Sequence, residues 1–233
     1  MKKTAYVFTG DFGHPKDTII PIISKIFDDK QWHVCVMDSI EDICFMSCAP
    51  DLLVSFQVGN SGITDHKPSW YESSPFTYQW IKWIREDGCG LLIVHGGLCF
   101  IPQDHPVITR GTIGYFNGHP QACSVHVVPV SNLHHPVTEG IGSFDLELDE
   151  HFQIKGLEEN DPNIQVLAYS SSSEGGTQPA VWVHTVEKGR ICVITPGHAS
   201  TNYRPLEHSC MLKLLRQSVN WCSQTDLPQK EVI

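Results

Sequence analysis

Gly90-Leu91-Leu92-Ile93-Val94-His95-Gly96-Gly97 is an apolar run that stops abruptly at a histidine and two glycines. A short run of this kind, preceded by a helical pattern that Gly88 closes, indicates a strand buried on both faces of a parallel sheet. His95 then lies at the carboxyl end of the strand, the edge at which open α/β sheets bind their ligands. Paired glycines let backbone amides approach a ligand, so we expect Gly96 and Gly97 to bind substrate. The alternative is a tight strand-to-helix turn with a packed imidazole.

The composition favours one α/β domain. The 233 residues, 41% of them hydrophobic, suffice for a single large core. A net charge of −10 and the absence of basic runs argue against a nucleic-acid partner, and no apolar segment reaches transmembrane length. The nine cysteines are scattered without a C-x-x-C pair, which is typical of free thiols in a cytoplasmic protein.

Apolar patterns along the chain predict a mainly parallel sheet with antiparallel additions. The first half contains strands at 4–9, 32–38, 51–56 and 90–94, separated by helical patterns at 19–27 and 76–84. The second half contains five strand segments without long helices between them, at 122–130, 144–154, 164–169, 179–184 and 190–195. A helix at 206–222 closes one domain that spans residues 1–233, with a frayed tail at 223–233.

Three loop segments lead to different expectations. The polar, glycine-rich loop 58–74 is long for a compact domain, so we expect it to cover the site and its His66 to bind substrate. The small polar residues of 170–176 predict a surface turn with no further role. His134-His135-Pro136 also predicts a turn, with one imidazole lining the pocket.

Imidazoles follow three of the predicted strands. His14 comes after the first, His95 after the fourth and His198 after the strand at 190–195, and Asp11 precedes His14 in the same loop. Because the carboxyl ends of parallel strands share one sheet edge, we expect a common polar site there. Imidazole and carboxylate without thiolate suit a divalent metal ion, zinc first among them, and we assign His14, His95 and His198 as ligands.

Asp149-Glu150-His151 adds carboxylates to this site. Alternation in a strand places Asp149 and His151 on one face and Glu150 on the other, so only one face is expected to reach the pocket. We assign Glu150, His14 and His95 as candidate catalytic residues, and Asp11 and Asp149 as candidate substrate-binding residues. Glu150 is the candidate base, or His14 if it is not a ligand.

Five segments occur in a distinctive order: 88–97 ending in His-Gly-Gly, 135–144, Asp149-Glu150, 189–198, and a terminal helix with Asn220-Trp221. In order and spacing they resemble the ThuA-like family of trehalose-utilisation proteins, which is related in fold to class I glutamine amidotransferases. The resemblance implies a flavodoxin-like three-layer sandwich and a polar site at His14, His95, Glu150 and His198.

The resemblance also shows two departures. Where an amidotransferase carries its cysteine this chain has Val94 or His95, and Cys99 lacks the second glycine of a nucleophile elbow, so glutamine hydrolysis is not expected. The family often has tyrosine three residues after the aspartate of its Asp-Glu pair, and here Phe152 stands in that place.

Two functions remain open from the sequence. One is a metal-assisted enzyme, without a cysteine nucleophile, in which an ion holds a carbonyl and a hydroxyl of a sugar or ketosugar and stabilises the enediolate formed on proton removal. The other is a non-catalytic sugar-binding or regulatory module on an amidotransferase-like scaffold. Both predict a small carbohydrate as partner, no nucleic acid and no membrane, and a homo-oligomer is compatible with either.

Overall fold

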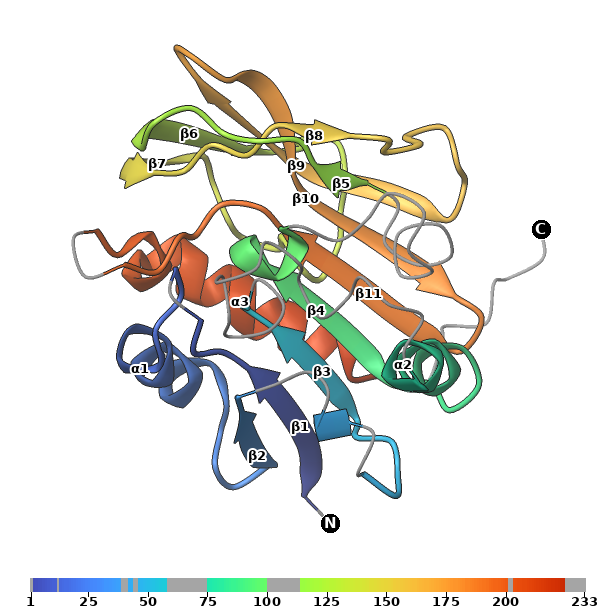
Figure 1. The fold of residues 1–233 in the computed structure, drawn as a ribbon. Coiled ribbons are helices and arrows are strands. Elements are labelled where there is room, and N and C mark those ends of the chain that lie inside the picture. Colours follow the sequence, from blue (N-terminus) through green and yellow to red (C-terminus); the bar gives the residue numbers. More distant parts are fainter. Residues whose placement is uncertain are drawn as a thin grey trace.

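Strand β4 (Gly90–Val94) lies inside a nine-stranded sheet with the order β2-β1-β3-β4-β11-β10-β9-β6-β7 (Figure 1). The structure is a computed structural model that describes residues 2–11, 13–38, 42–43, 46–57, 75–99, 114–200 and 203–224, without the side chains of 75–78. The other strands of the sheet are β1 (Lys3–Phe8), β2 (Trp32–Met37), β3 (Leu52–Ser55), β6 (Cys123–Pro129), β7 (Phe144–Asp149), β9 (Ile164–Ser172), β10 (Gly176–Val186) and β11 (Gly189–Ile194).

The sheet has a parallel half and an antiparallel half. Neighbouring strands from β2 to β11 in the sheet order are parallel, and those from β11 to β7 are antiparallel. A separate ribbon pairs β5 (Tyr115–Phe116) with β8 (Ile154–Lys155). The predicted mixed sheet, in which antiparallel strands are added to a parallel part, is therefore confirmed.

Helices cover both faces of the parallel half, which makes three layers (Figure 1). Leu92 and Val94 pack in one apolar cluster with α1 (Lys16–Ile26) and α3 (Ser209–Cys222). Leu91 and Ile93 point the other way and pack in a second cluster with the tryptophans of α2 (Pro75–Arg85). All positions of β4 are buried. Full burial of each leucine, isoleucine or valine side chain of this strand stabilises the fold by about 1.5–3 kcal/mol.

Two segments of the antiparallel half differ from the sequence prediction. The expected strand 144–154 is divided, since β7 ends at Asp149 and the chain pairs again only in β8. The expected surface turn 170–176 is mostly strand, because β9 continues to Ser172 and β10 begins at Gly176. Ser170 is buried, and its Oγ lies 3.0 Å from Nε2 of His151, so this residue joins two segments in the interior.

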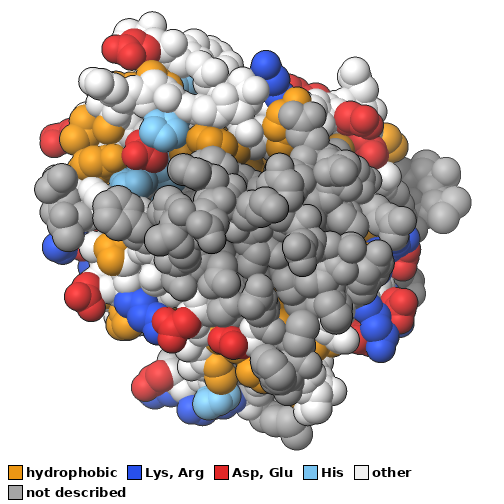
Figure 2. All heavy atoms as spheres, viewed as in Figure 1, with side chains coloured by type: hydrophobic (Ala, Val, Ile, Leu, Met, Phe, Trp, Pro, Cys, Tyr) orange, Lys and Arg blue, Asp and Glu red, His pale blue; other side chains and the backbone are white. Residues whose placement is uncertain are grey.

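Neither the charged surface nor the cysteines of the described residues point to a particular function. Figure 2 shows acidic and basic side chains scattered over the coloured part of one face. No helix of the described chain combines the length and the hydropathy needed to cross a membrane. The eight cysteines in the described residues form no disulfide with one another, and four of them are buried. The predicted tail from 225 onward and the loop 58–74 lie outside the described residues.

Candidate metal centre

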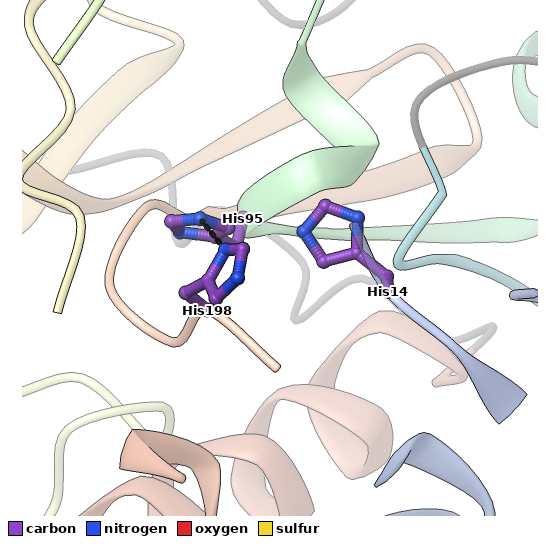
Figure 3. A group of neighbouring side chains, drawn as sticks. All are labelled: His14, His95 and His198. Atoms are coloured by element: carbon purple, nitrogen blue, oxygen red, sulfur yellow. Dashed lines mark hydrogen bonds between the residues drawn. The ribbon is translucent and has the colours of Figure 1, made fainter. Parts of the chain in front are cut away.

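Three imidazoles from distant parts of the chain meet at the carboxyl edge of the parallel strands. His14 follows β1, His95 opens the 3₁₀ helix η4 (His95–Leu98) after β4, and His198 follows β11. Their rings face one another (Figure 3), with centroids 5.2 to 5.6 Å apart. One nitrogen from each ring lies within 4.8 Å of the other two. The geometry is that of a site able to hold a metal ion.

His95 is held in a strained and buried position. Its φ of +43° is in the left-handed region that side chains with a Cβ rarely adopt, and its ring is 1% exposed. Nδ1 lies 2.7 Å from the carbonyl oxygen of Thr195, which can only accept, so Nδ1 carries the hydrogen. Burial lowers the pKa of His95 to about 4, against the opposing effect of the nearby Glu150 carboxylate. At neutral pH Nε2 therefore offers a lone pair, as a metal ligand must.

His14 is positioned by Asp11 and by a glycine. The Asp11 carboxylate accepts a hydrogen bond from the backbone N–H of His14 at 2.6 Å and lies 3.0 Å from its Nδ1. Nε2 is then directed to the other imidazoles, and it is buried without a hydrogen-bond partner among the described residues. A Cβ at Gly96 would overlap the His14 ring, so the ring fits only against a glycine. Pairing of carboxylate and histidine is the usual support of a histidine ligand.

His198 is presented by a turn that Asp149 fixes. The Asp149 carboxylate is fully buried and accepts hydrogen bonds from the backbone N–H groups of Gly197 at 2.8 Å and His198 at 2.9 Å. A third comes from the N–H of Glu150 at 3.0 Å. Burial raises the pKa of Asp149 to about 7, although the three N–H groups favour its charged form. Asp149 acts as a positioning residue for His198.

Glu150 reaches the same cluster from the antiparallel half. Its Oε2 lies 3.1 Å from Nδ1 of His198 and 3.4 Å from Nε2 of His95, and its side chain is 20% exposed. Burial pushes the pKa of Glu150 upward, but the imidazole nitrogens of His198 and His95 beside Oε2 outweigh it and hold the pKa well below the usual range. The carboxylate is therefore ionised beside the imidazoles.

The predicted alternation of Asp149 and Glu150 is wrong. Because β7 ends at Asp149, residue 150 is outside the pleat, and both carboxylates turn to the same edge of the sheet. The Asp149 carboxylate binds the backbone N–H groups of Gly197 and His198, whereas the Glu150 carboxylate contacts the imidazoles of His95 and His198.

The other candidate substrate-binding residues have structural contacts of their own. Gly97 packs so tightly on the backbone of Ser55 that a Cβ would overlap it, and Gly96 adjoins His14. Asp11 is 3% exposed and engaged with His14. The substrate-binding roles of Asp11, Asp149, Gly96 and Gly97 stay predictions, and His66 lies outside the described residues.

Three further side chains contact this cluster, and sequence reasoning missed two of them, those of His119 and Tyr203. His119 Nε2 lies 3.5 Å from Glu150 Oε2, and Tyr203 donates a hydrogen bond to Glu150 Oε1 at 3.2 Å. Phe152 lies against His95 with ring centroids 3.9 Å apart. The sequence analysis named only Phe152, as the residue in the place of a family tyrosine, and gave no signal for His119 or Tyr203.

Two further candidates from the sequence, the His134-His135 pair and Cys99, do not take part in the centre. Nδ1 of His135 accepts a hydrogen bond from the N–H of Val137 at 3.2 Å, which makes the predicted turn. His134 and His135 line a separate cavity of about 540 Å³ formed by residues of 128–143, and not the imidazole cluster. Cys99 is buried, and burial raises the pKa of its thiol well above the ordinary value, so it is no nucleophile at neutral pH.

The comparisons with solved structures show the fold. A thuA-like protein from Parabacteroides merdae superposes with a TM-score of 0.71 at 16% identity, over 99% of this chain and 93% of the other. One from Bacteroides uniformis gives 0.69 at 14% identity, over 95% and 91%. A glutamine amidotransferase from Thermotoga maritima gives 0.57 at 12% identity, over 96% and 99%. Curated protein sequences give no match.

The family comparison is more specific than the structural one. The family model named ThuA, described as trehalose utilisation, matches residues 78–222, which is more than half of the chain. The match includes His95, Glu150 and His198, and the fold brings His14 to them. The chain therefore belongs to the ThuA family of trehalose utilisation.

Proposed function

We propose that this protein is a divalent-metal-dependent enzyme of carbohydrate utilisation, in which His14, His95 and His198 bind one ion. The observation that carries the proposal is the mutual approach of three buried imidazoles, each with one nitrogen within 4.8 Å of the others. The buried Nε2 of His14, which has no hydrogen-bond partner among the described residues, adds an independent reason. A buried polar atom left without a partner costs about 1–3 kcal/mol, and a metal ion would remove that cost.

The donor set fits zinc or a neighbouring first-row ion. Nε2 of His95 and Nδ1 of His198 lie 3.3 Å apart. Two ligands of a tetrahedral zinc ion with bonds of about 2.0–2.1 Å lie about 3.3–3.4 Å from each other. Imidazole nitrogens with a nearby carboxylate oxygen and no thiolate are the ligands that such ions accept with an open position for substrate.

The chemistry follows from the residues around this set. When bound, the ion would polarise a carbonyl and an adjacent hydroxyl group of a sugar or ketosugar. Glu150, whose Oε2 lies within 3.4 Å of a nitrogen of His95 and of His198, would accept the proton from the carbon next to that carbonyl. His14 is the alternative base, but its Nε2 faces the other two imidazoles, so we assign it to metal binding. Asp11 and Asp149 would hold the ligands in place.

A non-catalytic sugar-binding module is the second candidate. It is favoured by the strand-to-helix turn after β4, which has Val94 or His95 where an amidotransferase carries its cysteine. No thiol nucleophile is available at this turn, since the thiol of Cys99 is buried and protonated. We place either function in the cytoplasm, where free cysteines are stable.

Elemental analysis of protein purified without a nickel column tests the metal. We expect about one equivalent of a first-row ion in the wild type and loss of that ion in His95→Ala and His198→Ala. His126→Ala is the matched control, because His126 is an exposed histidine 2.7 Å from Asp145 and outside the cluster. Metal-free protein that retains full turnover of a sugar or 3-keto sugar would rule the mechanism out. A sugar that binds and is never turned over would support the module.

A further inference from the structure

Two groups that do not hold the proposed ion line one side of Glu150, and the ring of one of them, Tyr203, stacks on His198 with centroids 5.1 Å apart. His119 comes from the segment between β5 and β6, and Tyr203 from the segment before α3. His119 approaches Oε2 of Glu150 at 3.5 Å and Tyr203 bonds to Oε1 at 3.2 Å, so the carboxylate lies between them. The side chain of His119 is 33% exposed, whereas His95 is 1% exposed. His119 therefore forms the open end of the centre.

The ring of His119 is fixed by an aromatic cluster. Phe152 lies nearly parallel to it at 23° with ring centroids 5.9 Å apart, and Phe116 is also 5.9 Å away. Phe152 in turn contacts His95 and Phe116, with centroids 3.9 and 4.5 Å apart. A continuous set of rings thus leads from the buried imidazoles to the exposed one. A flat, rigidly held ring at the mouth of a polar site is a surface on which the C–H face of a sugar ring packs.

The hydrogen-bond capacity of His119 points to a donor as its partner. Its Nδ1 lies 2.7 Å from the carbonyl oxygen of Pro120, which only accepts, so Nδ1 carries the hydrogen. In the neutral ring Nε2 is then an acceptor, and it faces Oε2 of Glu150, which is also an acceptor. Two acceptors 3.5 Å apart are satisfied by hydroxyl groups that donate to each of them. Neighbouring hydroxyl groups on a sugar ring supply that pattern.

We propose that His119 and Tyr203 form a subsite for a neutral, unphosphorylated sugar beside Glu150. The sugar ring packs on His119, and its neighbouring hydroxyl groups donate to Nε2 of His119 and Oε2 of Glu150. Within the described chain, the side chains that contact Glu150 are imidazoles and a phenol, with no lysine or arginine to bind a phosphate. This inference rests on the proposed function, because it takes a sugar as the ligand of the same centre.

Calorimetric titration of zinc-loaded protein with glucose, trehalose, 3-ketoglucose and glucose 6-phosphate tests the subsite. We expect at least one neutral sugar to bind the wild type, and His119→Ala to weaken its Kd at least tenfold. His119→Phe keeps the ring and loses the acceptor, and His119→Gln keeps an acceptor and loses the ring. Each should lose part of the affinity, about two- to fivefold, with unchanged zinc content and Tm. His126→Ala, remote from the centre, should bind like the wild type.

The outcomes separate this inference from the proposed function. Unchanged sugar affinity in His119→Ala would overturn the subsite, as would a wild type that binds only glucose 6-phosphate or none of the neutral sugars. If no metal is bound but the affinity of metal-free protein for the sugar depends on His119, the metal enzyme fails and the subsite stands. If zinc and turnover are found but KM is indifferent to His119, the subsite fails and the enzyme stands.

Discussion

Asp11 and His14 are joined twice, through the backbone N–H of His14 at 2.6 Å and through its Nδ1 at 3.0 Å. The first contact shapes the loop after β1, and the second fixes which ring nitrogen carries a hydrogen. Both effects aim Nε2 of His14 at His95 and His198. The proposed affinity for a metal ion thus depends on a carboxylate that does not touch the ion.

Asp11→Asn tests this dependence. The amide can still accept from the backbone N–H but no longer holds the ring by charge, so we expect the Kd for zinc to rise about 10- to 100-fold. Competition with a chromophoric chelator measures it. Asp145→Asn, an exposed partner of His126, is the matched control and should leave the Kd unchanged. Equal zinc affinity in Asp11→Asn and the wild type would show that Asp11 does not support a ligand.

Glu150→Gln separates a base from a ligand. The amide cannot accept the substrate proton at neutral pH, so we expect kcat to fall about 10²- to 10⁴-fold while the metal content stays the same. Turnover and elemental analysis on the same sample give both values. Loss of the ion together with activity would contradict the assignment and make Glu150 a ligand.

Gly96→Ala tests the close approach of η4 to His14. The new Cβ would overlap the His14 ring, so we expect a loss of about 1–3 kcal/mol in the free energy of unfolding and weaker metal binding. Gly142→Ala is the control, since a Cβ there meets no described atom within 4 Å. Urea unfolding of both variants measures the difference. A Gly96→Ala protein as stable as the control would mean that the ring moves aside freely.

Because the pKa of His135 is lowered in the folded protein, we expect a loss of stability in mild acid. Burial, with a contribution from the charge of Arg190, lowers the pKa of His135 to about 4, below the usual 6.5. As the pH falls from 6.5 toward 4 the unfolded chain takes up a proton that the folded chain refuses, so the free energy of unfolding decreases. The full contribution is present above about pH 6.5.

Urea unfolding at pH 7 and pH 5 of the wild type and His135→Gln measures this effect. Because His135 is partly exposed, we expect the variant to lose about 1 kcal/mol less than the wild type between the two pH values. His95 also has a lowered pKa, but it is present in both proteins and cancels in the comparison. An equal loss in both would show that His135 keeps its ordinary pKa in the folded protein.

The periodic spacing of apolar residues was enough to predict the fold from the sequence. The unbroken apolar run at 90–94 required cover on both faces, and the helical stripes beside it could supply that cover, so the layers followed. The sequence predicted the ends of the strands less well. Nothing in Phe144–Asp149 marks where pairing stops, and the rule of alternation then placed Glu150 on the wrong side. Ser170 was misjudged for the same reason, because small polar residues also extend a strand whose partner offers His151.

The centre was predictable where topology alone positions a residue. His14, His95 and His198 each follow a parallel strand, and such strands must end at one edge. His119 and Tyr203 come from segments without periodic pattern, and their places depend on the path of the chain between elements. The tilt of Phe152 against His95 is likewise a matter of packing, which no spacing in the sequence encodes.

The residues of this centre come from both sides of the junction between β11 and β10, where the sheet changes from parallel to antiparallel. Every imidazole of the triangle belongs to the parallel half, whereas Glu150 arrives from the far end of the antiparallel half, at the close of β7. In the proposed function, the ion is thus held by one section of the sheet and the base is supplied by the other, and Asp149 links the two sections through the turn of His198. A relative that alters the end of β7 would therefore lose the proposed base and, with Asp149, the carboxylate that holds the turn of His198.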